Sequence, residues 1–140
     1  GMRLIVVGIA VSAALNAPVA IPPGSRHVQR ARDFMHANLG SPVTLADVAA
    51  SAGTSPRTLQ VGFQRLHGCS PLQYLRARRL ELARAELERA ATAWRSVTEI
   101  ACDCGFTHMA KFSRAYRERY GETPSATRGR VMRGDAGAGS

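Results

Sequence analysis

Side chains with several hydrogen-bonding groups occur in two stretches of this chain. Arg57 and Gln60 lie in the first stretch, and Lys111 and Arg114 lie in the second. From a helix in the DNA major groove, Arg and Lys can bind the O6 and N7 atoms of guanine, and Gln can form two hydrogen bonds with adenine. These residue types therefore indicate base contacts, provided that the chain places them on exposed helices. Contact with phosphate or with solvent is the alternative.

The residues beside these four extend each candidate set. Val61 and Gln64 in the first stretch, and His108 and Met109 in the second, are further candidates for base contact. A thymine methyl group is the expected partner of Met109, and simple packing is the alternative. Nearby hydroxyl and guanidinium groups suit the phosphate backbone, which fixes the position of a protein on DNA. The candidates for backbone contact are Ser55, Thr58, Arg65, Thr107, Ser113 and Arg117.

A metal site or a catalytic site has less support. Cys102, Cys104 and His108 offer ligands of the kind that zinc binds, but Cys104 directly precedes a turn glycine, where a small buried residue is expected. Glu99 and Asp103 add carboxylates, yet no Gly-rich phosphate loop or nucleophile motif accompanies them. We therefore expect no metal, no cofactor and no enzymatic activity.

The two stretches belong to a unit that the chain contains twice, at residues 44–71 and 97–124. Each copy has the pattern of a short helix, a glycine turn and a second helix, which is the plan of the helix-turn-helix motif. Two such units favour a protein that reads DNA. The matching positions are Leu45, Val48, Ala49 and Gly53 with Val97, Ile100, Ala101 and Gly105, and then Leu59, Phe63, Gly68 and Pro71 with Phe112, Tyr116, Gly121 and Pro124.

The charge of the chain agrees with a nucleic-acid partner. Its 140 residues include 19 Lys and Arg against 10 Asp and Glu, which gives a formal net charge of +9. The basic side chains are concentrated in and just after the second helix of each unit, where they would attract phosphates. A basic surface without such a partner is the alternative. The 3 cysteines form no disulfide framework and suit a reducing cytoplasm.

Capping signals mark where helices are expected to begin. Thr44 with Asp47 has the spacing of a capping box, and so does Ser96 with Glu99. In a capping box, each of the two side chains bonds the backbone N–H of the other residue. Thr107 is expected to cap the second helix of the second unit.

A longer helix is expected between the units, at about residues 70–90. It would be about 30 Å long at about 1.5 Å per residue. That length is close to one turn of B-DNA, about 34–36 Å, so the helix could set both units into successive major grooves. Arg76 and Arg79 lie near its apolar side, so an ion pair with Asp47 or Glu99 is at least as well supported as a DNA contact. The expected apolar side consists of Leu72, Leu75, Leu80, Ala83 and Leu87.

The two ends of the chain lie outside this pattern. Gly1 resembles the scar of a cleaved tag. Within residues 1–25, an apolar run precedes a Pro- and Gly-containing linker, and we expect a remnant of an upstream domain or a stray start. A membrane span is disfavoured because the run is too short, and a secretion signal because its cleavage spacing is poor. Residues 129–140 are Gly-rich and basic and are expected to form a disordered tail.

These motifs together resemble the DNA-binding domain of the AraC/XylS family of bacterial transcription regulators. The resemblance covers residues 26–128. In the first unit and the helix after it, the motifs are residues 45–49, Gly53, Ser55, Leu59, Phe63, Gly68, Ser70, Pro71, Tyr74, Leu75, Arg79, Leu80, Ala83 and Leu87. In the second unit they are Ile100, Ala101, Cys104, Gly105, Phe106, Phe112, Ser113, Arg114, Tyr116, Gly121 and Pro124.

The resemblance implies an all-α, homeodomain-like domain of about seven helices. Two helix-turn-helix subdomains, at about residues 26–69 and 91–128, would be joined by a linker helix at about residues 70–90. It implies a monomer that places two recognition helices in adjacent major-groove segments of double-stranded DNA, with RNA polymerase as a further possible partner. Family members usually carry a separate effector-binding or dimerisation domain, and residues 2–25 are expected to hold at most its tail.

Two departures from the family pattern weaken the first recognition helix. Val61 stands where the family often has a basic residue, and Gly62 replaces a stronger helix former. Glycine within a helix costs about 0.5–1 kcal/mol relative to alanine. The alternative function is a basic DNA-architectural or protein-docking module that binds every sequence equally.

Overall fold

The computed structural model describes residues 25–89 and 93–134, which form seven α-helices and no strand. The predicted all-α fold is therefore confirmed. The predicted apolar segment and the end of the predicted tail fall largely on residues 1–24 and 135–140, outside the described residues. The helices are α1 (Ser25–Ala37), α2 (Leu45–Ala52), α3 (Pro56–His67), α4 (Pro71–Glu88), α5 (Val97–Asp103), α6 (Met109–Tyr120) and α7 (Pro124–Met132).

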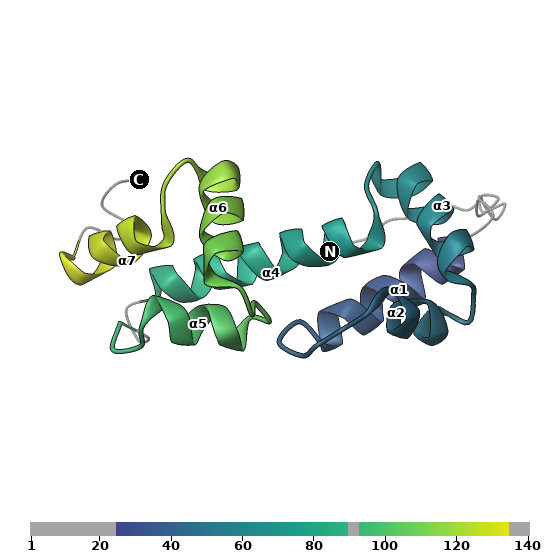
Figure 1. Ribbon diagram of the computed structural model, residues 1–140, viewed down its shortest axis with the longest axis horizontal. Helices are drawn as coiled ribbons and strands as arrows, with labels where there is room; N and C mark the ends of the chain where they lie inside the picture. Colours follow the sequence, from purple (N-terminus) through teal and green to yellow (C-terminus); the bar gives the residue numbers. More distant parts are fainter. Residues whose placement is uncertain (1–24, 90–92, 135–140) are drawn as a thin grey trace, which may run out of the picture.

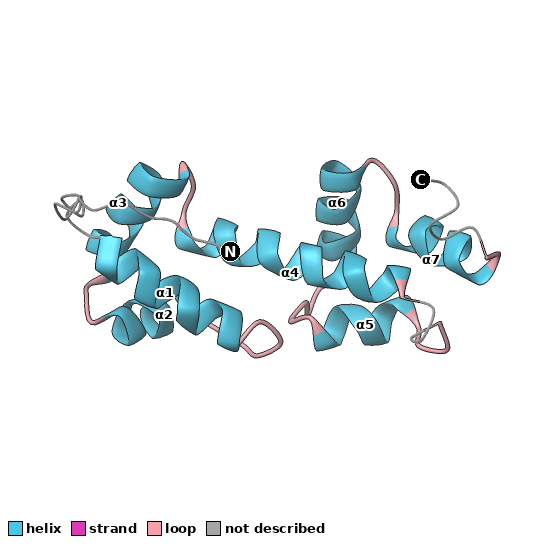
Figure 2. Cartoon of the chain, turned by 180° about the vertical axis from the view of Figure 1, so that it is seen from behind, coloured by secondary structure: helices cyan, strands magenta, loops and turns pink. Residues whose placement is uncertain are grey.

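The helices form two groups at opposite ends of α4 (Figure 1). Helices α1–α3 make up the first unit, and helices α5–α7 make up the second unit. Seen from either side, α3 and α6 lie on the same side of α4, while α1, α2 and α5 lie on the other (Figures 1 and 2). The two helices expected to recognise DNA therefore lie on one side of the molecule.

Each unit has its own hydrophobic core, and α4 contributes to both. In the first core, Phe63 and Leu59 of α3 pack with α1, α2 and Leu75 of α4. In the second core, Phe112 and Tyr116 of α6 pack with α5 and with Leu80, Ala83 and Leu87 of α4. Burying one large apolar side chain contributes about 1.5–3 kcal/mol. Each unit is thus stabilised by its own core, and α4 holds the two cores together.

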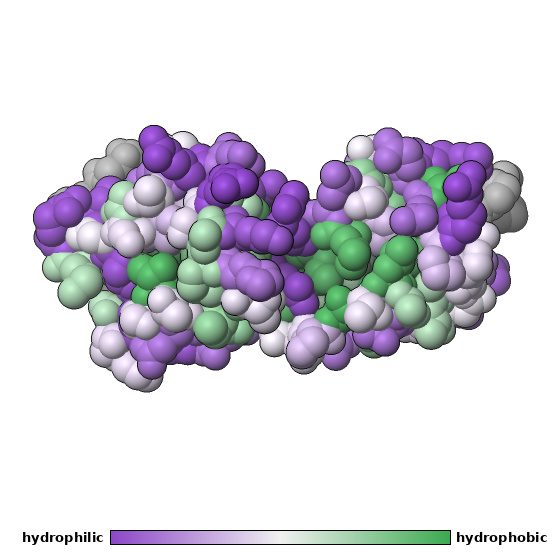
Figure 3. All heavy atoms as spheres, viewed as in Figure 1, coloured by the Kyte–Doolittle hydropathy of each residue, from purple (hydrophilic) through white to green (hydrophobic). Residues whose placement is uncertain are grey.

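The prediction that Leu72 belongs to the buried side of α4 is wrong, because this side chain is 42% exposed. Helix α4 packs on the first core through Leu75 and on the second through Leu80, so different sides of the helix are buried along its length. Leu72 instead lines a hollow of about 270 Å³ between the units, together with Val43 and Phe106. Figure 3 shows apolar side chains at the surface between the units.

The predicted capping boxes at the starts of α2 and α5 are confirmed. The N–H of Asp47 donates to Thr44 Oγ1 (3.1 Å), and the N–H of Thr44 donates to Asp47 Oδ2 (3.0 Å). Ser96 and Glu99 form the same pair of bonds at 3.0 and 2.8 Å. Between the helices of the first unit, Gly53 has φ 72°, in the left-handed region that glycine adopts without steric cost.

Two predicted boundaries are wrong. His108, not Thr107, is the N-cap of α6, and no side chain caps that helix start. The second unit has one more residue than the first between its turn glycine and its second helix, which moves the cap position along the chain. The expected tail from residue 129 is helical as far as Met132, because α7 continues and Val131 is buried, only 8% exposed.

Candidate nucleic-acid interface

The first recognition helix, α3, presents all four of its predicted base-contact residues on one exposed face. Arg57, Gln60, Val61 and Gln64 are exposed and line one shallow depression together with Ser70. The opposite face of α3 is fully buried through Leu59 and Phe63. The side chains on the exposed face include two amides and one guanidinium, which supply the donors and acceptors that base edges require.

The predicted backbone contacts of the first unit surround the start and end of α3. Ser55 is the N-cap of α3, where its Oγ accepts from the N–H of Thr58 (3.2 Å) and donates to Thr58 Oγ1 (3.0 Å). Both side chains therefore stabilise the helix start, and that helix start is also a suitable place for a phosphate. Arg65 is exposed in the last turn of α3.

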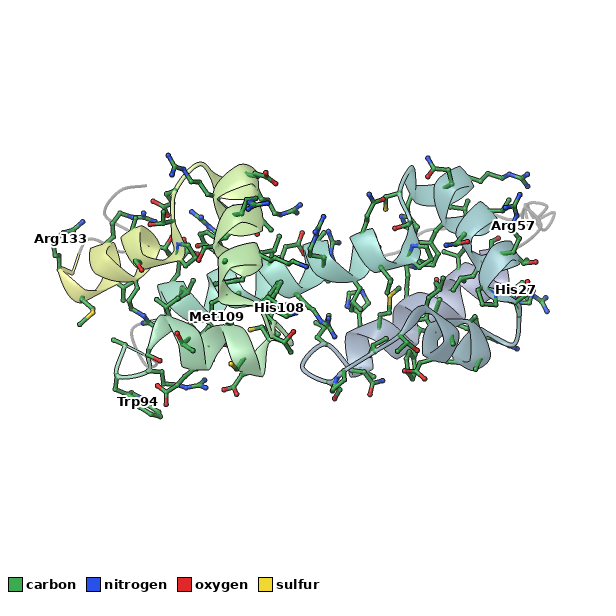
Figure 4. The ribbon with its side chains drawn as sticks, in the orientation of Figure 1. His27, Arg57, Trp94, His108, Met109 and Arg133 are labelled. Carbon is green, nitrogen blue, oxygen red and sulfur yellow. The ribbon has the colours of Figure 1, made fainter. Side chains whose placement is uncertain are left out.

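The second recognition helix, α6, exposes His108, Lys111 and Arg114. Met109 differs, because it is half-buried and packs against the second core. Packing is therefore its main role. Figure 4 shows His108 and Met109 at the start of α6, with His108 on the side that faces the middle of the molecule. The predicted backbone-contact residues here are all exposed; they are Thr107, Ser113 and Arg117.

Several arginines form ion pairs with acidic residues of the domain. Glu81 binds Arg78 and Arg119, both at 2.8 Å, and Glu122 binds Arg130 and lies 3.6 Å from Arg84. Within the described part of the chain, no ion pair involves the basic residues expected to contact DNA, which are Arg57, Arg65, Lys111, Arg114 and Arg117. The acidic residues therefore leave these five basic side chains available to phosphates and bases.

The ion pair of Arg79 with Asp47 or Glu99, one of two interpretations offered for this residue, is wrong. Arg79 Nε donates to the carbonyl oxygen of Leu39 (2.8 Å), and Nη2 donates to that of Ser41 (2.6 Å). Asp47 and Glu99 belong to their capping boxes, and the hydrogen bond from the Ser96 backbone lowers the pKa of Glu99. Arg76, the other arginine in this prediction, is exposed and forms no ion pair with any described residue.

The cysteines do not share one site. Cys104 is 1% exposed in the second core, and burial raises the pKa of its thiol to about 11. Cys102 is exposed on α5, and Asp103 is paired with Arg95. Over the residues that the structure describes, no group of three His, Cys, Asp or Glu side chains is placed to hold a metal ion. The thiol of Cys104 therefore acts as a small buried group of the core.

Sequence patterns missed the contact that Arg79 makes with the loop between α1 and α2. The sequence offered one indication of this contact, a charged residue between the buried positions Leu75 and Leu80 of α4. That signal shows that Arg79 lies near the junction of the two cores, but it does not identify its partner.

Two helix-turn-helix units on one shared helix, each with an exposed polar face on its second helix, define a DNA-binding domain of a transcription regulator. Residues 48–130 match a family model described as a helix-turn-helix domain. The chain belongs to the AraC family of transcription regulators, as its motifs indicated. None of the described helices is long and apolar enough to cross a membrane.

Two similar proteins are named as operon regulators. The chain is 38% identical over 104 residues to the XylDLEGF operon transcriptional activator 2 of Pseudomonas putida, covering 74% of this chain and 66% of that protein. It is 42% identical over 98 residues to the probable thc operon regulatory protein of Rhodococcus erythropolis, covering 70% of this chain and 30% of that protein. The chain therefore spans only part of the length of these relatives.

A solved structure agrees with this assignment over almost its whole length. It is that of a probable AraC family transcriptional regulator from Rhodopseudomonas palustris CGA009, with a TM-score of 0.70 and 35% sequence identity. The match covers 75% of this chain and 96% of that chain. The arrangement of two units around one helix is therefore shared with a member of the family.

Proposed function

We propose that this domain binds one double-stranded DNA site as a monomer, with α3 and α6 in two successive segments of the major groove. The observation that carries the proposal is the position of α3 and α6 on the same side of α4 (Figures 1 and 2). A duplex presents its major groove to one side once per turn, about every 34–36 Å. Helix α4 has 18 residues, or about 27 Å at about 1.5 Å per residue, and so it bridges most of that distance.

The exposed faces of α3 and α6 divide into residues for base edges and residues for phosphates. Met109 is the weakest candidate for a base contact, because it packs on the second core. The proposed base contacts are Arg57, Gln60, Val61, Gln64, His108, Lys111 and Arg114. The proposed phosphate contacts are Ser55, Thr58, Arg65, Thr107, Ser113 and Arg117.

The names of the relatives support a role in regulating transcription for the whole protein. One relative is named as an operon transcriptional activator and the other as a probable operon regulatory protein, and we propose that a protein containing this domain regulates an operon in the cytoplasm, where bacterial DNA lies. Contact with RNA polymerase stays a prediction.

Selection of bound fragments from random DNA, followed by footprinting on the selected site, tests this function. Two protected segments about 10–10.5 base pairs apart on one face of the duplex are expected. Sedimentation of the complex should give one protein per duplex. Protection of a single segment, or binding only as a dimer, contradicts the proposal.

The same experiment distinguishes a sequence-specific regulator from a non-specific architectural module. Such a module would leave no common sequence among the selected fragments, and its affinities for selected and random duplexes would be equal. A specific site is expected to bind at least about 1,000-fold more tightly than random DNA at the same salt concentration.

A further inference from the structure

The two units contact each other directly, in addition to sharing α4. The loop after α1 meets the turn between α5 and α6, and Arg79 of α4 lies against both. We call this the inter-unit contact; it consists of residues 39–41, residues 103–105 and Arg79.

Glycines at two positions allow the backbones of the units to approach this closely. A Cβ atom on Gly40 would lie 2.5 Å from the carbonyl oxygen of Asp103. A Cβ atom on Gly105 would lie 2.5 Å from the carbonyl oxygen of Leu39 and 2.6 Å from Arg79 Nε. Even favourable carbon–oxygen contacts in proteins are about 3.3–3.6 Å, so a side chain at either position would push the units apart.

Arg79 closes the contact from the side of α4. Its guanidinium donates to the carbonyl oxygens of Leu39 (2.8 Å) and Ser41 (2.6 Å). The planar guanidinium presents its donors in a fixed geometry, so two bonds to one loop fix the orientation of that loop relative to α4. The Cζ atom of the same side chain would lie 2.9 Å from a Cβ on Gly105, which places the guanidinium directly against the second unit.

The location of the inter-unit contact suits a role in fixing the orientation of the two units relative to each other. The first core ends on α4 at Leu75 and the second begins at Leu80, so the cores themselves do not hold the units to each other. A single helix between two bodies permits bending and twisting at that junction. A second attachment beside the junction removes these motions, because the units are then held at two places.

We propose that the inter-unit contact determines which spacing between two DNA half-sites this protein accepts. The inference rests on the proposed function, in which α3 and α6 each read one half-site. One added base pair moves the second half-site by about 3.4 Å along the duplex axis and also rotates it. A rigid pair of units would lose the contacts of one unit on such a site, whereas a loosened pair would keep them.

Gly40→Ala and Arg79→Gln test this role, and Gly68→Ala serves as the control. Gly68, unlike Gly40, has a positive φ (69°), and a Cβ atom there would have no neighbour within 4 Å, so this substitution strains the backbone without displacing a unit. Arg79→Gln adds no bulk at the contact, and it keeps the test available if Gly40→Ala does not fold. A thermal melt of each variant verifies folding.

The first measurement is the distance between the units in the free protein, by pulsed dipolar electron spin resonance. Spin labels are attached at Ala50→Cys on α2 and at Cys102 on α5, both of which are exposed positions. A Cys69→Ser background removes the half-buried thiol, and Cys104 is buried and unreactive. We expect one narrow distance distribution in the parent protein and in Gly68→Ala, and broader distributions in Gly40→Ala and Arg79→Gln.

The second measurement is affinity for duplexes that carry the selected site with its half-site spacing changed by one or two base pairs. The parent protein and Gly68→Ala should lose at least about tenfold in affinity with one base pair added, or about 1.4 kcal/mol. Gly40→Ala and Arg79→Gln should lose less than about threefold on the same change, while their affinity for a single half-site stays at the parent value.

The outcomes separate this inference from the proposed function. Unchanged distance distributions in both contact variants, or broader distributions with an unchanged spacing preference, overturn the role of the inter-unit contact. A parent protein that binds every duplex equally overturns the proposed function, and the spacing role with it.

Discussion

Arg114→Ala is expected to weaken binding to the selected site much more than binding to random DNA. The side chain of Arg114 is exposed, and no ion pair involves it among the described residues. Removing it leaves no buried group without a partner, so the free energy of unfolding should change by less than about 0.5 kcal/mol. One bidentate contact with guanine contributes about 1–3 kcal/mol of discrimination, which is about 5- to 150-fold in affinity.

Fluorescence anisotropy titrations with selected and random duplexes of equal length, at one salt concentration, measure this effect. The matched control is Arg119→Ala on the same helix. Arg119 Nη2 lies 2.8 Å from Glu81 Oε2, and this pair is partly exposed to solvent. Such surface pairs contribute about 0–1 kcal/mol, so Arg119→Ala removes the same charge from α6 without removing a base contact. Its affinity ratio between the two duplexes should stay at the parent value.

Two results would refute this reasoning. Equal losses on both duplexes for Arg114→Ala would make this residue a phosphate contact, because phosphates carry no sequence information. Equal losses for Arg114→Ala and Arg119→Ala on the selected site would show that overall charge, and not the face of α6, determines binding. A selection repeated with Arg114→Ala should also relax the preference at one or two base pairs of the site.

Three further predictions concern salt, the second core and pH. The logarithm of the binding constant should fall against the logarithm of salt concentration with a slope of about −5 to −7, if the domain neutralises about 6–8 phosphates; a slope shallower than about −2 would exclude the basic faces as the binding surface. Cys104→Ser should lower the free energy of unfolding by about 1–3 kcal/mol in a thermal melt, because it places a hydroxyl in an apolar site. A titration of the folded variant should show unchanged DNA affinity. Hydrogen bonds from Arg130 and Thr127 hold the pKa of Glu122 below its ordinary value of 4.5, so the stability they provide is complete above about pH 4.5 and is lost as the pH falls through the lower value. Glu122→Gln should therefore lose less stability than the parent between pH 5 and pH 2, about the acid range of carboxylate titration, in melts recorded across that range; an equal loss would contradict the assignment.

Local signals predicted most of the helices and the faces of the recognition helices. Thr44 and Asp47 are three residues apart, and the bonds they form require only the first turn of α2. Helical periodicity also determines that Leu59 and Phe63 share one side of α3 while Arg57 lies on another. These features depend on a few neighbouring residues, so the sequence alone is sufficient to predict them.

Features that depend on packing between distant segments were not predictable in this way. Leu72 has the spacing of a core residue, but α4 turns a different side to each core and leaves it exposed. Arg79 finds its partners in a loop that lies 38 to 40 residues earlier in the chain. Val131 lies in a segment whose composition resembles a disordered tail, yet it is buried in α7.

Because two cores share α4, the number of residues between them determines the angle between the two units about the axis of this helix. One residue inserted into an α-helix turns everything after it by about 100° and moves it by about 1.5 Å along the axis. An insertion between Leu75 and Leu80 would therefore carry α6 around the axis of α4, away from the side on which α3 lies, although both cores could still form. An insertion in the loop between α6 and α7 would leave that angle unchanged. The helical phase between residues 75 and 80 is thus constrained by the direction in which the two units must face, and the length of the loop between α6 and α7 is free of that constraint.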